Sequence, residues 1–581
     1  MKAMENNEDY RALFPFSICL FLAYLLPYHV APFPAFYSEW LAVFGVFTLL
    51  AYLIKKKTIF FQVPWIAIIP LGLAIIIAVQ TFAGMLNESW DALLPIAYLL
   101  VTALAIMLGA NIASSKVGFS NLLKGLSSVY LMAGLMSVMI VSLQLAGAEI
   151  SFAPFMMVLP HPQAGLIRPY ANLGQANQVA ELFCLAIASI WWLYQVQQVR
   201  ASVAIAAVLA LLWGLALTQS RIGWIIVPLF VLVNWVWHGK HGFRIIPNWV
   251  ALGSFFAYVA FVVFALPALS ALLNASGVSV IEHFTGRSVR MIFFRQALQM
   301  SLSHPWFGVG WFQFGSQQLA LAPIFPPTEY SQHAHNIVLN FAAEIGWPAT
   351  AIIIVALTCW FNKIYRKRPF SKEVGASLLL LLTVLVHSFI EYPLWYAYVL
   401  LPVGLLIGAI HQEQLGTLRV RVPYPHLIIA VIVMASTLIG VAMDYRRVAT
   451  AFWQMDMESM GLKLTGFKLE HVAEKPNVTM FPYAYDFFEF MNASVYEGMP
   501  ASEIASMERT TRRFPGPQVL TRMSQVYAMN HRGDDAVRAM LDVERLYNPS
   551  QYKVAYEAWR QAPEQYQPIF KRLPLPAEVV Q

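Results

Sequence analysis

Charged side chains are scarce in this sequence. Only 12% of its 581 residues are Asp, Glu, Lys or Arg, whereas 59% are hydrophobic. Soluble globular domains carry about twice that share of charged residues. The composition therefore argues against an ordinary soluble protein and predicts a polytopic membrane protein.

Cysteine is also nearly absent, and the three residues Cys19, Cys184 and Cys359 all lie in apolar stretches. Cysteines in this context suggest neither a metal site nor a disulfide framework. We therefore expect no metal and no cofactor. We also expect no cleavable signal peptide, because the first apolar run contains Pro27 and lacks a convincing small-residue cleavage site.

Long apolar runs dominate the rest of the chain. There are about thirteen, each long enough to cross roughly 30 Å of hydrocarbon. Backbone groups in lipid must pair within their own segment, so these runs are predicted to be helices. The expected fold class is an all-α polytopic membrane protein with spans near residues 12–30, 38–54, 64–83, 92–110, 126–147, 179–194, 202–219, 222–237, 249–268, 337–360, 374–391, 394–411 and 427–443.

Positive charges fall in every second loop, which marks those loops as cytoplasmic. The N-terminus is predicted on the same side, and an odd number of helices puts the C-terminal segment on the opposite face. The net charge of +7 follows mostly from this bias, so it does not indicate nucleic-acid binding. The charges in question are Lys55, Lys56, Lys57, Lys116, Lys124, Arg200, Lys240, Arg244, the stretch "NKIYRKRPFSK", Arg419 and Arg421.

Five arginines lie on the predicted outer side, where arginine should be rare: Arg168, Arg221, Arg287, Arg290 and Arg295. A guanidinium is always charged and offers a rigid fork of donors, which suits phosphate or pyrophosphate. Alternatively, each arginine reaches the interface with its head group or pairs with a carboxylate. As a set, the five favour an anionic ligand.

The largest outer loop, residues 269–333, contains a segment with an amphipathic pattern. At 100° per residue, Arg287, Arg290 and Arg295 share one polar arc. We expect a helix that lies along the membrane surface and turns its arginines toward the outer side.

A second outer loop, residues 159–183, is rich in amides. Asn172, Gln175, Asn177 and Gln178 stand at the start of an apolar helix, where amides suit sugar hydroxyls or phosphate oxygens. Ordinary turn and N-cap chemistry explains one such residue, but not four.

The stretch "SQHAHNIVLNFAAEIGW" brings His333 and His335 to the start of another helix. Asn336, Asn340 and Glu344 follow at i, i+4 and i+8 and form a polar stripe. Either histidine is a candidate base, and the alternative is that both only complete a helix end.

A further polar pair, His387 and Glu391, lies one helical turn apart just before Tyr392 and Pro393. Glu391 is predicted to bind an arginine or to tune a histidine. The alternative is a structural ion pair between helices.

Five stretches together carry a resemblance: "RPYANLGQANQVA", "TQSRIGW", "RMIFFRQALQMSLSHPWFGVGWFQF", "HAHNIVLNFAAEIGW" and "HSFIEYPLWYAYVLLP". In this order they resemble the bacterial O-linked oligosaccharyltransferases of the PglL type, within the superfamily of O-antigen ligases and Wzy polymerases. "HAHN" and "SRIGW" are typical of the superfamily, whereas "NLGQANQ" and "HSFIEYPLW" favour the protein-glycosylating branch. One departure is Phe294, where relatives often have Trp.

The resemblance implies an inner-membrane enzyme of Gram-negative bacteria whose active site and C-terminal segment face the periplasm. Such enzymes transfer a glycan from undecaprenyl diphosphate to a Ser or Thr hydroxyl of a protein, often a type IV pilin. His335 matches the family's essential histidine, and Arg221 and Arg290 match arginines that bind the diphosphate. With the patterns above, the residues expected to bind substrates are Arg287, Arg168, Asn172, Gln175, Asn177, His333, Asn336, Glu391 and Tyr392.

The expected mechanism needs no metal. Diphosphate is a good leaving group, so positioning and fixed positive charge can drive its departure. A neutral histidine is suited to take the proton of the acceptor hydroxyl. The hypothesis is that His335 is this base or orients the acceptor.

The C-terminal segment, residues 444–581, is more charged than the predicted transmembrane glycosyltransferase domain, residues 1–443. Residues 522–550 resemble one helix–turn–helix unit of a tetratricopeptide-type repeat. We expect a small periplasmic helical domain that shapes acceptor access or acts as a simple lid.

Two rival functions stay open. An O-antigen ligase or Wzy-type polymerase would carry similar motifs but glycosylate a glycolipid or glycan. A transporter or flippase should show internal repeats and charges near the membrane midplane. The polar residues here gather at one face instead, which disfavours transport.

Overall fold

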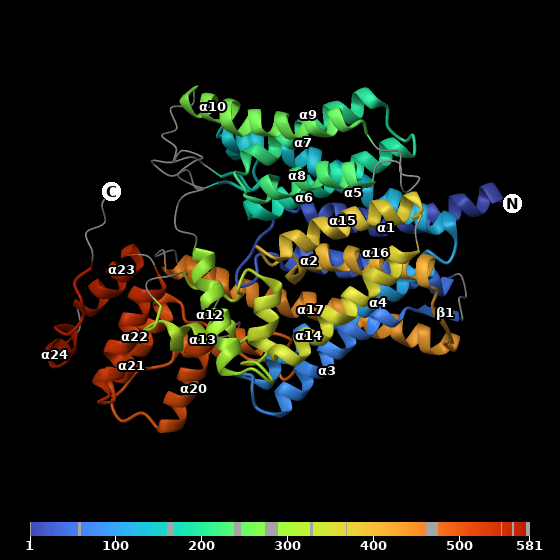
Figure 1. Cartoon of the computed structure of the whole chain (residues 1–581). Helices are drawn as coiled ribbons and strands as arrows, with labels where there is room; N and C mark the ends of the chain where they lie inside the picture. Colours follow the sequence, from blue (N-terminus) through green and yellow to red (C-terminus); the bar gives the residue numbers. More distant parts are fainter. Residues whose placement is uncertain are drawn as a thin grey trace. The chain divides into compact units, whose positions relative to one another are not determined.

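The computed structural model describes residues 2–55, 60–159, 168–237, 246–272, 289–325, 329–367, 369–459, 474–547, 549–560 and 563–576. Their regular secondary structure is almost wholly helical (Figure 1). The exception is an antiparallel pair of short strands, β1 (Phe60–Val63) and β2 (Leu418–Arg421). The chain is all-α in class, as predicted, and it divides into two units.

Unit 1 comprises Met1–Gly72, Tyr98–Arg287 and Val355–Gly440. A short π-helical turn, η4 (Phe261–Ala265), joins two of its helices. The helices that lie mainly in unit 1 are α1 (Lys2–Leu25), α2 (Phe36–Lys55), α4 (Leu93–Ile112), α5 (Lys116–Leu145), α6 (Ala176–Gln195), α7 (Ala201–Leu217), α8 (Ile222–Trp237), α9 (Asn248–Ala260), α10 (Leu266–Leu272), α15 (Lys372–Ser388) and α16 (Ala397–Leu415).

Helix α6 forms the core of unit 1. Most of its residues are buried, and it packs against α5, α7 and α15 (Figure 1). Gly134 of α5 permits this close approach, because a Cβ at that position would lie 2.8 Å from the Cβ of Ala186. Small residues let apolar helices pack closely inside a membrane protein. The start of α6, which carries the amide-rich motif, is therefore firmly positioned.

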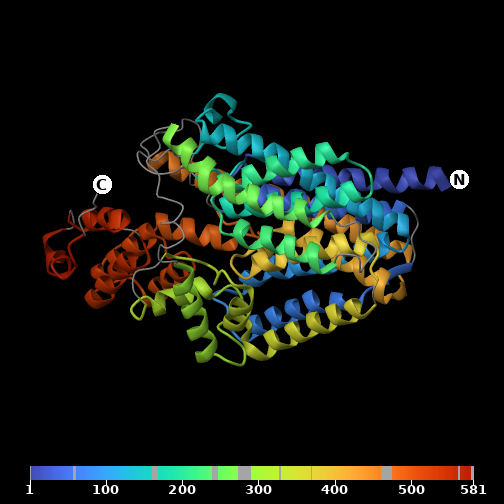
Figure 2. The ribbon, with the colours of Figure 1, turned by 45° about the horizontal axis from the view of Figure 1, so that its top comes forward.

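Unit 2 comprises Leu73–Ala97, Ser288–Ile354 and Val441–Gln581. It contains the end of α3 (Ile68–Phe82), the short helix η2 (Ser89–Ala92) and the beginning of α14 (Ile337–Arg366). The ends of α3 and α14 that belong to this unit run side by side in both views (Figure 2). The other helices are α12 (Val289–Ser303), α13 (Phe314–Leu321), the end of α17 (Tyr424–Ser459), α19 (Pro482–Asn492), α20 (Ala501–Arg513), α21 (Pro517–Met529), α22 (Gly533–Leu546), α23 (Pro549–Arg560) and α24 (Gln567–Phe570).

The C-terminal helices of unit 2 pack around an apolar core. Met540 and Val543 of α22 pack with Tyr552 and Trp559 of α23, and Leu319 of α13 lies against the same cluster. Helices α21 and α22 form the helix–turn–helix expected from the sequence. Because α13 shares this core, the C-terminal helices are continuous with the segment that precedes the histidine motif.

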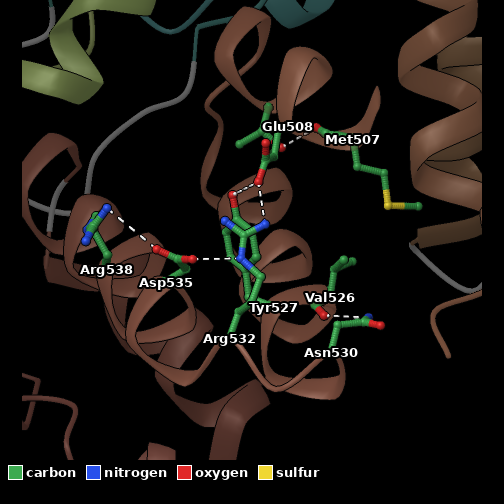
Figure 3. Close-up of polar contacts among 9 residues, drawn as sticks. Met507, Glu508, Val526, Tyr527, Asn530, Arg532, Asp535 and Arg538 are labelled. Carbon is green, nitrogen blue, oxygen red and sulfur yellow. Dashed lines mark hydrogen bonds and ion pairs between the residues drawn. The ribbon is translucent and has the colours of Figure 1, made fainter. Parts of the chain in front are cut away.

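Polar contacts connect α20, α21 and α22 (Figure 3). Arg532, in the turn between α21 and α22, contacts Glu508 of α20 at 2.8 Å and Asp535 of α22 at 2.7 Å. The hydroxyl of Tyr527 also donates to Glu508, and the Arg532 guanidinium lies 4.4 Å from the Tyr527 ring centroid. Exposed ion pairs contribute little stability one by one. Here they fix the angle between three helices.

Eight helices among the described residues are long and apolar enough to cross a membrane, and three shorter apolar helices accompany them. Many of their large apolar side chains are exposed, including Phe256 on α9, Ile352 on α14 and Val433 on α17. Water would not tolerate so much exposed apolar surface, whereas lipid does. The chain is therefore a multi-pass membrane protein. Each predicted span overlaps helical residues, but the count of thirteen crossings stays a prediction.

Candidate functional site

The loop that leads into α6 carries the amide-rich motif of unit 1. It passes through Ala171 and Gly174, whose φ angles are 50° and 74°, and ends at Gln175, the residue before the first turn of α6. A left-handed conformation is unfavourable for a residue with a Cβ such as Ala171. The surrounding protein must therefore hold this loop in shape.

Asn172 supplies much of that support. Its Nδ2 donates to the carbonyls of Leu25 (2.8 Å) and Phe155 (3.0 Å), and its Oδ1 accepts from the backbone N–H of Met157 (3.1 Å). The side chain is buried. Both of its N–H donors are used within the protein, so we interpret Asn172 as the residue that shapes the loop.

Three segments of unit 1 meet around Asn177, in the first turn of α6. Asn177 Nδ2 donates to Glu391 Oε1 at 2.6 Å. Its Oδ1 accepts from Ser220 Oγ at 2.8 Å and from Arg168 Nη2 at 3.4 Å. We call Arg168, Asn177, Ser220 and Glu391 the Asn177 cluster. The amide has one orientation here, because its oxygen faces the two donors and its nitrogen faces the carboxylate.

Arg168 is anchored at the C-terminal end of α7. Its Nε donates to the carbonyl of Thr218, the C-cap residue, at 3.2 Å. The last carbonyls of a helix carry partial negative charge, which favours a cation at this position. Glu391, at the other side of the cluster, is only 4% exposed. The guanidinium is therefore held by protein acceptors at a defined place.

Arg221 lies in the tight turn between α7 and α8. The turn passes through Gln219, with a φ of 51°, and the backbone N–H of Ser220 donates to Thr218 Oγ1 at 3.2 Å. Arg221 itself is half-buried and directly follows Ser220 of the Asn177 cluster. Arg168 is thus part of the Asn177 cluster, and Arg221 is its neighbour along the chain through Ser220.

Gln175 and Tyr392 flank the same cluster along the chain. Gln175 is half-buried, and its side chain does not cap α6. Tyr392 follows Glu391, and its ring stacks on that of Tyr396 at 6.0 Å. Neither residue is part of the Asn177 cluster as defined above.

Two buried acids of unit 1 did not stand out from the sequence. Glu181 of α6 lies 3.2 Å from Nδ1 of His387 of α15, and both side chains are buried. The Glu39 carboxylate of α2 accepts from the backbone N–H of Ala397, the first residue of α16, and from the Tyr98 hydroxyl. An acid inside an apolar run is costly unless it is paired. That cost is the signal by which both residues could have been found.

The histidine loop of unit 2, which we define as residues 331–336, is fixed by side chains from neighbouring helices. Gln318 of α13 accepts from the backbone N–H of Ser331 at 2.8 Å. Asn340 of α14 accepts from the backbone N–H of Ala334 at 2.9 Å. Both amide side chains are buried. The loop therefore has one conformation set by α13 and α14.

His335 has an unusual backbone in this loop, with a φ of 54°. Its ring is half-buried and stacks on Phe293 of α12, with centroids 5.2 Å apart. Non-glycine residues in this region cost free energy and persist only where the surroundings hold them, which is frequent at functional sites. The histidine that the motif singles out is thus held in a strained, defined position.

His333 has a different environment, because its side chain is buried. Its ring packs edge-on against Phe312, with centroids 5.5 Å apart. Burial, together with a smaller effect of the neighbouring His335, lowers the pKa of His333 to about 3. His333 is therefore uncharged at neutral pH, and its ring packs against Phe312.

The polar stripe after the histidines is divided between several tasks. Asn336 Oδ1 accepts from the backbone N–H groups of Val338 (3.1 Å) and Leu339 (3.0 Å) and so caps α14. Asn340 holds the histidine loop, as described above. The Glu344 carboxyl faces the backbone N–H groups of Phe312 and Phe314, at the start of α13.

Helix α14 is broken at Gly346, where φ is 81° and ψ is 166°. The break leaves carbonyls without helical partners, and the segment before α13 supplies donors to them. The backbone N–H of Val309 donates to Ala343 at 2.8 Å, and that of Gly310 donates to Glu344 at 3.1 Å. The predicted span over 337–360 lies within α14, one of the candidate membrane-crossing helices, and the break at Gly346 is a feature that the sequence pattern did not predict. The short first part of α14 is a separate element that carries the histidine loop.

Helix α12 presents Arg290 in its first turn. Arg290 is half-buried, whereas Arg295 is exposed. Phe293, Ala297 and Met300 form the buried face of the helix at i, i+4 and i+7. Arg287 lies outside the described residues. Across the described part of the chain, no three His, Cys, Asp or Glu side chains gather as metal ligands would.

Comparison with known proteins adds two family matches and two relatives. A family model described as O-Antigen ligase matches residues 205–354, and one described as virulence factor membrane-bound polymerase, C-terminal, matches residues 376–562. The chain is 27% identical over 408 residues to a general O-oligosaccharyltransferase of Acinetobacter baylyi, which covers 68% of this chain and 69% of the relative. It is 26% identical over 389 residues to a ComP-specific O-oligosaccharyltransferase of the same organism, which covers 65% and 67%.

Proposed function

Because the chain is a bacterial O-oligosaccharyltransferase of the PglL type, we propose that it transfers a preassembled glycan from undecaprenyl diphosphate to a Ser or Thr hydroxyl of a periplasmic or pilin protein. It is a membrane enzyme that moves a glycosyl group. We propose further that it lies in the inner membrane, with its N-terminus in the cytoplasm. The active site and the helical domain of residues 444–581 then face the periplasm.

The observation that most supports this proposal is the left-handed backbone conformation of residues in the motifs. Four non-glycine residues with positive φ, namely Ala171, Gln219, Phe312 and His335, lie in four of the five motifs. Strained backbone of this kind is kept where a site needs a side chain or carbonyl in one place. A polytopic protein without chemistry at these loops would have little reason to keep it.

In the proposed reaction, His335 accepts the proton of the acceptor hydroxyl or orients that hydroxyl. The freed oxygen attacks the anomeric carbon of the glycan, and the bond to the diphosphate breaks. A histidine suits this task because its neutral form can take a proton near pH 7. The His335 ring is supported by stacking on Phe293, while the uncharged His333 packs against Phe312.

Positive charge for the leaving diphosphate is proposed to come from Arg221 and Arg290, with Arg287 and Arg168 as further contacts. A guanidinium whose position is fixed in advance stabilises developing negative charge without reorganising. Arg168 fits this requirement because Thr218 and Asn177 hold it. Gln175, Glu391 and Tyr392 complete the proposed substrate-binding set.

The experiment that tests the function is transfer in cells that supply a lipid-linked glycan. The protein is expressed with that donor and with a pilin, a lipid A core acceptor, or neither. Glycan on the pilin is the expected result, and its loss in an equally expressed His335→Ala variant assigns the chemistry to this site. Glycan found only on lipid A core, or only as elongated chains, would instead establish the ligase or polymerase alternative.

A further inference from the structure

The last residue of α20, Arg513, makes an unusual set of contacts within unit 2. Its Nη1 lies 2.9 Å from Asp91 Oδ2 of η2, and the side chains are only 16% and 2% exposed. Its guanidinium lies 4.9 Å from the ring centroid of Tyr483 and 5.5 Å from that of Phe312. A guanidinium can pair with a carboxylate in its plane while aromatic rings contact its faces.

Phe312 connects this arrangement to the histidine loop. Its φ of 60° is a genuine outlier for a bulky residue, so neighbouring groups must hold it. The Arg513 guanidinium lies over the Phe312 ring, and the His333 ring contacts the same ring edge-on. The backbone N–H of Phe312 faces the Glu344 carboxyl. Phe312 therefore lies between the C-terminal helices and His333.

We propose that Arg513, oriented by Asp91, is a positioning residue that holds Phe312 and through it the histidine loop. Through Phe312, the C-terminal segment thus contributes to the geometry of His335. A mostly buried ion pair adds little net stability, because desolvation offsets its attraction. Its value here is a defined direction for the aromatic ring beneath the loop. The inference rests on the proposed role of His335.

The chain contains a matched control one helical turn earlier. Arg509 of α20 also contacts the segment around η2, through Glu88 at 2.9 Å, but these side chains are 43% and 42% exposed. The two pairs connect the same elements with the same charges. The difference is that the Arg513 guanidinium also lies against the ring of Phe312, which contacts His333 of the histidine loop.

The test compares full-length Arg513→Ala, Arg513→Lys and Arg509→Ala enzymes in lipid nanodiscs, with the lipid-linked glycan as donor and the acceptor that the wild type uses. We expect Arg513→Ala to lower kcat on the order of 10- to 100-fold, as misplaced catalytic groups do, with KM for the donor changed less than about twofold. Arg513→Lys keeps the charge but loses the planar contact, so it should restore part of kcat. Arg509→Ala should match the wild type.

A second measurement guards against a variant that fails to fold. In a double-mutant cycle, Arg513→Lys and Phe312→Leu should be strongly non-additive in kcat if they act through one contact. Additive effects, equal losses in Arg513→Ala and Arg509→Ala, or a change confined to donor KM would overturn the proposal. A wild type that glycosylates only glycolipid would overturn the proposed function alone, because the same comparison can be run on that acceptor.

Discussion

His335 combines two properties that a substitution can separate: an imidazole ring and a left-handed backbone. Asparagine tolerates this backbone better than most residues but cannot act as a base at neutral pH. We expect the free energy of unfolding of a His335→Asn variant to lie within about 1 kcal/mol of the wild-type value, since asparagine also tolerates the left-handed backbone. Glycan transfer should nevertheless fall by at least about 100-fold. Near-normal transfer by this variant would exclude His335 as the base.

His333 predicts a pH dependence of stability. Burial lowers its pKa to about 3 from an ordinary value of 6.5. Between these values the unfolded chain binds a proton that the folded chain excludes, so this residue's stabilising contribution is lost as the pH falls. We expect the wild type to lose about 2 kcal/mol more than His333→Gln between pH 7 and pH 5. Thermal unfolding in detergent at the two pH values measures this, and equal losses would contradict it.

At the scale of elements, the broken helix α14 depends on Gly346. Its φ is 81°, and a Cβ there would lie 2.4 Å from the carbonyl oxygen of Trp306. Gly346→Ala should therefore destabilise the protein by roughly 2–4 kcal/mol through strain and displaced backbone. The control is Gly440→Ala in α17, where a Cβ would meet nothing within 4 Å. This control should be neutral or slightly stabilising. Equal thermal midpoints for the two variants would refute the assignment.

Elements differ in how well the sequence predicts them. Apolar runs predict helices well, because lipid leaves the backbone no other partner. The break at Gly346 was missed, since the carbonyls of Ala343 and Glu344 before it accept from Val309 and Gly310, each 34 residues away in the sequence. Local pattern alone does not reveal such partners.

The residues of the candidate site also differ in how well the sequence predicts them. The motifs indicated His335 as a candidate base, and the outer arginines indicated an anionic ligand. Both predictions were possible because these residues are unusual at their places in the chain. The separate roles of Asn172 and Asn177 were not predictable. They depend on which backbone and side-chain groups tertiary packing brings near each amide. Asp91 and Arg513 were missed for the same reason.

At the scale of the whole molecule, the C-terminal helices and the histidine loop belong to the same unit, unit 2. The backbone N–H of Tyr330, just before the histidine loop, donates to the carbonyl of Leu546 at 3.1 Å. The rings of Tyr330 and Tyr547 also stack. The C-terminal helices are thus part of the body that carries the loop. We see them as structural partners of the catalytic region.

A truncated chain tests this view. Ending the protein after residue 513 removes α21 to α24 but keeps Arg513 and all predicted site residues. We expect transfer to fall more than about tenfold, because Tyr330 loses its partners and the loop its support. A chain ending after residue 576 should behave as the full-length protein. Full activity of the shorter chain, measured at equal membrane levels, would show that the C-terminal helices are dispensable.

The carboxylate of Glu39 also bears on how the protein is made. Its backbone partner, Ala397, is 358 residues further along the chain. Helix α2 therefore enters the bilayer long before the ribosome has produced the amide that its acid needs. During that interval the acid must remain protonated, stay near the lipid surface, or be shielded by the insertion machinery. Unit 1 cannot be completed before α16 arrives, so nascent chains arrested before residue 397 should be sensitive to quality-control proteases.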